Sequence, residues 1–244
     1  MKKLISAYKY QLANQMNATA WFYGVILIIY FSGWILSGKG WLPGFGTNAV
    51  EFSSIFLFVM GLCSFRENFH MLTQNNIQRG NLFKSRLMVV VTAAAVVALA
   101  DILVSGIFSA TGGGFIMPSV FRTEYVITDG AFFIPMEFLY KFAVNLLMTT
   151  SGYFITLMFY RLNAIGKVLV GAGIPLLMFA AFMFNEYLCI TYDVFINYGA
   201  FMETLMGKDV FPYNPHIAVL TFTAVACFFT GATWLLIRKA PVKK

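Results

Sequence analysis

Residues 87–108 of the chain read LMVVVTAAAVVALADILVSGIF, an apolar run that contains a single charged residue, Asp101. A helix needs about 20 apolar residues to cross the hydrocarbon core of a bilayer, and this run is long enough. Apolar and polar residues do not alternate along it, as they would in a strand of a membrane barrel. The run therefore predicts a transmembrane α-helix.

The composition of the whole chain agrees with this prediction. Of its 244 residues, 59% are apolar and only 11% are charged, and 27 are phenylalanine. Soluble domains are roughly 45–50% apolar and about 25% charged, so this chain lacks the polar residues to cover a water-soluble globule. Its three cysteines are far apart in sequence, which argues against a disulfide framework or a zinc module. We predict a multi-pass integral membrane protein.

Similar apolar runs predict six transmembrane helices in one all-helical domain, residues 18–244. The predicted spans are residues 18–36, 49–65, 87–108, 132–160, 168–188 and 217–237. Before them, residues 1–17 place Leu4, Tyr8 and Leu12 on one helical stripe, which predicts an amphipathic helix at the membrane interface. Between spans 5 and 6, residues 189–216 are aromatic but interrupted by charges, and we expect short re-entrant or interfacial helices there.

The basic residues predict the orientation of the spans. Most of the 17 lie before span 1, between spans 2 and 3, between spans 4 and 5, or after span 6. Because loops rich in Lys and Arg stay on the cytoplasmic side, both termini are expected in the cytoplasm. The net charge of +7 is then a topology signal. Membrane lipid is the expected environment, and no nucleic-acid partner is expected.

The longest predicted cytoplasmic segment, residues 66–86, is the most polar part of the chain. Apolar side chains alternate there with hydrogen-bonding groups, which is typical of a short helix that docks into a groove of a partner protein. The candidate docking residues are Arg66, Glu67, Asn68, Phe69, His70, Leu72, Gln74, Asn75, Asn76, Ile77 and Arg79. The open alternative is that this segment only extends spans 2 and 3 beyond the lipid headgroups.

The loop has the form ENF-x-x-L-x-Q-N-N-x-x-R-x-x-x-F-K, in which Phe69, Asn75, Asn76, Arg79 and Phe83 are the marked positions. With the amphipathic N-terminal helix and the six spans, it makes the chain resemble the permease subunits of bacterial ABC-2 type ABC transporters. The resemblance implies a coupling helix in this loop, two copies of a separate ATPase that binds ATP and Mg²⁺, and a second copy of the permease. It also implies location in the bacterial plasma membrane.

In size, the chain resembles the small Gram-positive exporters of peptides and lipids, including those that export amphipathic toxin peptides. This resemblance implies an apolar or amphipathic cargo such as a peptide, a lipid or an antibiotic. The chain itself has no G-x-x-x-x-G-K-[ST] motif and no HExxH motif. We therefore predict no catalytic residue, metal site or cofactor in this chain, and we expect a partner to hydrolyse the ATP.

Three ionisable residues lie deep within the predicted spans: Asp101, Glu137 and Lys141, whereas Glu51 and Glu186 lie at span ends. A rise of 1.5 Å per residue gives Asp101 and Lys141 overlapping depths, and the spacing of Glu137 and Lys141 suits a helical ion pair. Charges inside a membrane often mark a transport path, so these residues are predicted to line the path or to lock its gate.

Three alternatives stay open for the chain. The three ionisable residues could be a structural cluster that holds spans 3 and 4 together. They could instead be the coupling site of a secondary transporter driven by an ion gradient. Finally, the chain could be a membrane immunity or assembly protein that binds a partner and transports nothing.

Overall fold

The computed structural model describes residues 2–38, 52–110, 121, 125, 130–192, 198–208 and 213–238. In this part of the chain all regular elements are α-helices, as predicted. They are α1 (Lys2–Gly38), α2 (Phe52–Gln74), α3 (Arg79–Ala110), α5 (Gly130–Arg161), α6 (Ala164–Tyr192), α7 (Tyr198–Leu205) and α8 (Pro215–Arg238).

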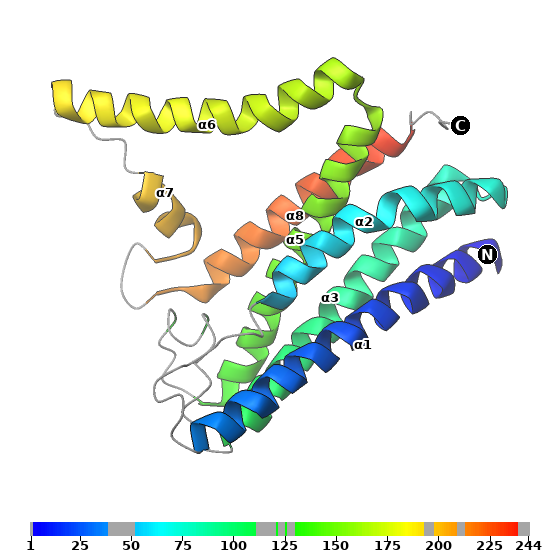
Figure 1. Cartoon of the computed structure of the whole chain (residues 1–244), viewed down its shortest axis with the longest axis horizontal. Helices are drawn as coiled ribbons and strands as arrows, with labels where there is room; N and C mark the ends of the chain where they lie inside the picture. Colours follow the sequence, from blue (N-terminus) through cyan, green and yellow to red (C-terminus); the bar gives the residue numbers. More distant parts are fainter. Residues whose placement is uncertain are drawn as a thin grey trace.

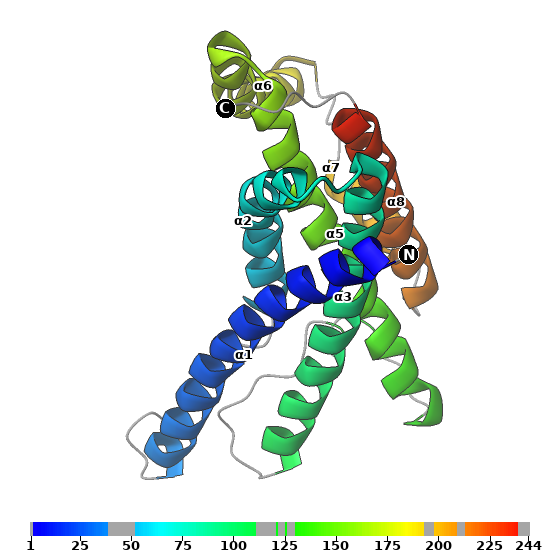
Figure 2. The same ribbon diagram turned by 90° about the vertical axis from the view of Figure 1, so that its right-hand side faces the viewer.

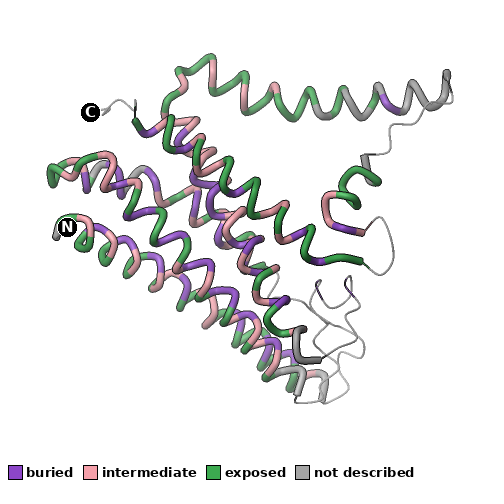
Figure 3. The backbone as a smooth tube through the Cα atoms, turned by 180° about the vertical axis from the view of Figure 1, so that it is seen from behind, coloured by how far each residue is buried: buried purple, intermediate pink, exposed green. Residues whose placement is uncertain are grey.

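Helix α5 is the centre of a bundle. It packs against α2, α8 and α3, and α1 packs mainly along α3 (Figures 1 and 2). The start of α1, the end of α8 and the turns α2–α3 and α5–α6 all lie at one end of this bundle (Figure 1). We call it the basic end, because it holds Arg79, Arg161 and Arg238. Buried positions lie where these helices face one another (Figure 3).

Four of the described helices are long and apolar enough to cross a membrane: α1, α3, α5 and α8. The chain is therefore suited to a membrane, as its composition predicted. The apolar part of α2, Phe52–Phe65, is shorter, and residues 49–51 of the second predicted span lie outside the described residues. The structure thus supports four of the six predicted spans.

Helix α6 contains the fifth predicted span but does not join the bundle. It turns away from α5 at residues 162–163 and extends outward from the basic end (Figure 1). Most of its described apolar side chains are exposed; among them Val168, Leu176 and Leu177 are about 70% exposed. A helix without a polar face is not stable in water, so α6 requires lipid or another protein surface around it.

The N-terminal 17 residues do not form a helix of their own, because α1 runs without interruption from Lys2 to Gly38. Its buried stripe also differs from the predicted one: Ala7, Gln11, Gln15 and Thr19 face inward. Gln11 Nε2 donates a hydrogen bond of 3.0 Å to Ser85 Oγ in α3. The polar side of the predicted interfacial helix therefore packs against α3.

Helices α2 and α5 cross at two glycines. A Cβ atom at Gly61 would lie 2.5 Å from the carbonyl oxygen of Thr149, and one at Gly152 would collide with the carbonyl oxygen of Phe58. Small residues let membrane helices approach this closely. Thr156 Oγ1 also donates to the carbonyl of Leu62 at 2.7 Å, which joins the same two helices.

Between α6 and α8 the structure describes one short helix, α7. Gly207 ends it with φ +67°, and Lys208 N–H bonds to Glu203 O at 2.8 Å, a Schellman cap. Asn214 caps α8, since its Oδ1 accepts the N–H of His216 at 3.0 Å. Residues 193–197 and 209–212 lie outside the described part, so of the predicted short helices only α7 is seen.

Candidate functional site

Four polar side chains form a stripe along the buried face of α5. Glu137, Lys141, Asn145 and Thr149 are each one helical turn apart and only 0%, 6%, 0% and 0% exposed. Side chains with this spacing share one face of a helix. Polar groups at such positions of an apolar bundle are uncommon and often functional, so this polar stripe and its neighbours are the candidate site.

Asp101 of α3 is 1% exposed and accepts hydrogen bonds from two other helices. Tyr23 of α1 donates its hydroxyl to Oδ1 at 2.5 Å, and Ser53 of α2 donates to Oδ2 at 2.6 Å. Hydrogen bonds to a carboxylate are short and strong, and they offset part of the cost of burying it. Asp101 thereby joins α1, α2 and α3.

Asn145 connects the polar stripe to the same helices. Its Oδ1 accepts a hydrogen bond of 3.0 Å from Ser54 in α2, and its Nδ2 lies 3.5 Å from the carbonyl of Ala94 in α3. Thr149 Oγ1 donates back to the carbonyl of Asn145 at 2.7 Å. Two groups of hydrogen-bonded side chains, one around Asp101 and one around Asn145, therefore join neighbouring helices of the bundle.

The three predicted path residues all lie in the interior of the bundle. Glu137 and Lys141 are on one face of α5, as their spacing predicted, and Asp101 accepts hydrogen bonds from Tyr23 and Ser53. Sequence reasoning missed these two hydroxyl residues, because they lie among apolar residues and no local pattern indicates that they bind Asp101. Asn145 and Thr149 had a signal, because they continue the four-residue spacing of Glu137 and Lys141.

The predicted docking anchors Phe69 and Leu72 are not on a surface. They are 1% and 3% exposed and belong to the core of the basic end. The ring of Phe69 stacks on Phe65 with centroids 5.1 Å apart and meets Tyr160 edge-on at 5.8 Å. The prediction that these side chains dock into a partner is corrected, because α2 continues past its apolar part and buries them within the chain.

No separate coupling helix is present in the described residues between α2 and α3. Helix α2 ends at Gln74, and its last turns bend across the basic end (Figure 2). Asn76 has φ +54°, and Ile77 N–H reaches back to Leu72 O at 3.1 Å, so the helix closes with a Schellman cap. The structure therefore supports the alternative in which this segment extends the spans.

The side chains left exposed by this turn form its tip: Met71, Gln74, Asn75, Asn76 and Gln78. Next to the tip, Arg79 Nη1 donates a hydrogen bond of 3.0 Å to the carbonyl of Arg238, which ties α3 to the last turn of α8. Asn68 is 7% exposed and donates to the carbonyl of Ser64. The side chains of Arg66, Glu67 and His70 lie outside the described ones.

We expect Tyr23→Phe and Asp101→Asn to destabilise the protein through the same contact. A hydrogen bond to a charged group contributes about 1.5–3 kcal/mol, so each variant should lower the melting temperature in detergent. Together they should lower it by less than the sum of the two effects, because they remove one shared interaction. Tyr10→Phe, at an exposed tyrosine of the same helix, is the control and should change nothing. Fully additive losses would contradict the contact.

No protein-family model matches this chain, and no curated protein or solved structure matches it either. Among the described residues, no group of three or more His, Cys, Asp or Glu side chains could hold a metal ion. The candidate site is therefore a set of buried polar and ionisable side chains inside an apolar bundle.

Proposed function

We propose that this chain is the transmembrane permease subunit of an ATP-driven exporter of the ABC-2 type in the bacterial plasma membrane. The observation that carries the transport proposal is the buried polar stripe with Glu137 and Lys141, together with the buried Asp101 of α3. Charged side chains inside a membrane bundle are costly and are characteristic of transport paths. The cargo would be apolar or amphipathic, such as a peptide, a lipid or an antibiotic.

The tip of the α2–α3 turn is the part that would meet the ATPase. Its exposed polar groups, such as Gln74 and Asn75, stand on a firmly packed base, since Phe69 and Leu72 beneath them are core residues. The bond from Arg79 to the end of α8 adds a third helix to this base. A push on the tip would therefore move α2, α3 and α8 together, as a switch driven by a partner requires.

In this proposal two ATPase subunits bind ATP and Mg²⁺, and a second copy of the permease completes the membrane part. We place the second copy against α6, because this helix leaves the bundle of its own chain and exposes its apolar side chains. Packing against another apolar surface within the bilayer would satisfy this helix.

The test is co-purification of the tagged protein from native membranes with its ATPase. Replacing Gln74 and Asn75 together by alanine should reduce the recovered ATPase at least about tenfold, as expected for loss of central interface contacts. The melting temperature of the permease should stay the same, because both side chains are exposed. Asn14→Ala, at an exposed asparagine of α1, is the matched control.

Three results would count against the proposal. If the double variant retains its ATPase, the tip is not the contact. If the natural protein brings down no ATPase at all, the second candidate becomes the better one: an ion-coupled secondary transporter, which the burial of Asp101, Glu137 and Lys141 favours. A third experiment mutates the Walker lysine of the bound ATPase, so that ATP hydrolysis stops. If the chain keeps its effect on the cell under this condition, the non-transporting immunity or assembly function is favoured.

A further inference from the structure

Helices α5 and α8 both finish at the basic end with an arginine. Arg161 lies in the last turn of α5, and Arg238 lies in the last turn of α8. Cations are favoured at such positions because the C-terminus of a helix carries a partial negative charge. Both side chains are exposed, and the hydrogen bond from Arg79 uses only the main-chain carbonyl of Arg238. Each helix end therefore carries a cation that a ligand can reach.

These two arginines line one open groove between α5 and α8. The groove has a volume of about 630 Å³, which is within the usual range of ligand sites, about 300–1,000 Å³. Its other lining residues are apolar: Phe154, Met158, Ala232, Leu235 and Leu236. None of the described residues that line it is acidic. The groove therefore combines a positively charged rim with an apolar wall.

The charged and the apolar residues of the groove lie at different depths. On α5, Phe154 precedes Arg161 by seven residues, which is about 10 Å at 1.5 Å per residue. On α8, Ala232 precedes Arg238 by six residues, or about 9 Å. The apolar wall thus extends from the basic end toward the middle of the spans, and Leu235 within it is 66% exposed. A phospholipid has the same order, because its charged headgroup lies above its acyl chains.

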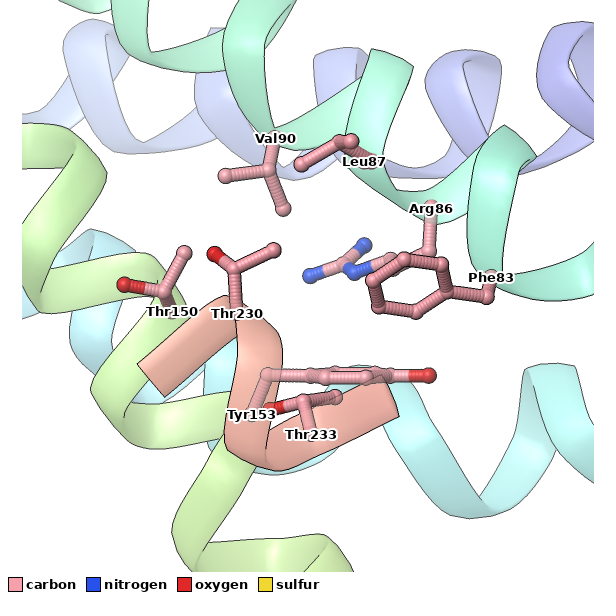
Figure 4. A pocket seen from close by; sticks show the side chains of 8 residues that line it. All are labelled: Phe83, Arg86, Leu87, Val90, Thr150, Tyr153, Thr230 and Thr233. Atoms are coloured by element: carbon pink, nitrogen blue, oxygen red, sulfur yellow. The ribbon is translucent and has the colours of Figure 1, made fainter. Parts of the chain in front are cut away.

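A pocket beside Arg86, between α3, α5 and α8, differs from this groove (Figure 4). It has a volume of only about 20 Å³ and an almost wholly apolar lining, so it has room for about one water molecule. Arg86 itself is 3% exposed, donates a hydrogen bond to Gln15 and lies over the ring of Tyr153. That pocket is therefore part of the packed interior, whereas the groove at Arg161 and Arg238 has room for a ligand.

We propose that the groove between α5 and α8 binds an anionic phospholipid of the cytoplasmic leaflet. The lipid phosphate accepts hydrogen bonds from Arg161 and Arg238, and one acyl chain lies along Phe154, Met158 and Leu235. Basic pockets between membrane helices on the cytoplasmic side suit such headgroups. The bound lipid neutralises the rim and joins the ends of α5 and α8. This inference rests on the predicted cytoplasmic position of the basic end, but on neither the ATPase nor the cargo, so it goes beyond the proposed transport function.

The test measures the melting temperature of the delipidated protein in detergent at constant ionic strength. Short-chain phosphatidylglycerol is titrated, and phosphatidylcholine with the same chains is the comparison, because its headgroup has no net charge. We expect a saturable rise whose midpoint with phosphatidylglycerol is at least about tenfold lower than with phosphatidylcholine. Inorganic phosphate is the third probe. An equal rise with phosphate at the same concentration would assign the rim to a free anion and overturn the proposal.

Variants of the rim decide whether the preference comes from this groove. Arg161→Gln combined with Arg238→Gln should remove the preference for phosphatidylglycerol. Lys84→Gln combined with Lys167→Gln is the matched control, because it removes two charges from exposed residues that do not line the groove, and it should keep the preference. The variant without the two arginines should fold, since both side chains are exposed and Arg79 bonds only to the main chain of Arg238.

A second pair of variants tests the apolar wall. Leu235→Ser should weaken the apparent affinity for phosphatidylglycerol about fivefold, because part of the leucine side chain no longer packs against the acyl chain. Leu220→Ser in the same helix is its control. Leu220 is 71% exposed and does not line the groove, so this variant should keep the affinity of the natural protein.

Three further results would overturn the proposal. The first is no saturable response to phosphatidylglycerol, or an equal response to phosphatidylcholine. The second is an equal loss of preference in the two-arginine and the two-lysine variants, which would assign the effect to the charge of the whole surface. The third comes from light scattering on the same samples. If Leu235→Ser separates a dimer of the natural protein and neither lipid changes the melting temperature, a second copy of the chain occupies the groove.

Discussion

Gly152→Ala is expected to force α2 and α5 apart and to destabilise the bundle. The added Cβ would collide with the carbonyl oxygen of Phe58, and the facing Gly61 is in the same situation against Thr149. Since both obstacles are backbone atoms, no side-chain rotation can relieve the contact. Overpacking of this kind costs about 1–3 kcal/mol, and because α5 is the central helix, Gly152→Leu should prevent folding.

The measurement is the melting temperature of the purified protein together with the yield of monodisperse material. Gly231→Ala in α8 is the matched control, because a Cβ there would meet nothing within 4 Å. Alanine is a better helix former than glycine, so this control should melt at the same temperature or higher. If Gly152→Ala melted as the natural protein does, the close crossing of α2 and α5 would be disproved.

Phe69→Ala is the second substitution with a large expected effect. The Phe69 ring is 1% exposed and packs against Phe65 and Tyr160 in the core of the basic end. Removing a buried phenylalanine ring costs about 3–5 kcal/mol, because the cavity that remains closes only in part. We therefore expect a large fall in melting temperature and, as a consequence, loss of any partner bound at the tip.

Met71→Ala is the control for this second substitution. Met71 lies on the same helix but is 38% exposed, and its truncation should change stability by no more than about 0.5 kcal/mol. The two readings of the segment give opposite results for Phe69→Ala. If the variant keeps its melting temperature but loses the ATPase, Phe69 contacts the partner directly, and the burial described above is wrong.

The segment 66–79 illustrates a limit of sequence reasoning. Apolar residues three or four positions apart, such as Phe65, Phe69 and Leu72, indicate one face of a helix. The same spacing is found in a helix that docks into a partner and in a helix that packs within its own chain. Only the course of α2 against α5 and α8 decides that this face is internal.

Arg86 shows the same limit for a charged residue. At the edge of a predicted span it resembles any cation that marks the cytoplasmic side. In the structure α1 places Gln15 on one side of it and α5 places Tyr153 on the other. Those neighbours are distant in sequence, so no local pattern could have indicated that this arginine is buried.

What the sequence by itself determined is the class of the protein and the places where its interior is polar. A mean hydropathy of +0.75 and long apolar runs require a helical membrane protein, because each helix satisfies its own backbone hydrogen bonds in lipid. The burial of Asp101, Glu137 and Lys141 followed from their positions within apolar runs. These properties depend on solvent preference and on spacing along one helix, which are local.

The tertiary structure alone decided the direction of each helix and the partners of each buried polar group. The apolar character of α6 defines the medium that it prefers, yet leaves open whether it joins the bundle or leaves it. In the same way, the carboxylate of Asp101 requires donors, but only the crossing of three helices selects Tyr23 and Ser53. The physical reason is that packing and hydrogen bonding between helices depend on residues far apart in the chain, whereas hydropathy and periodicity report only on neighbours.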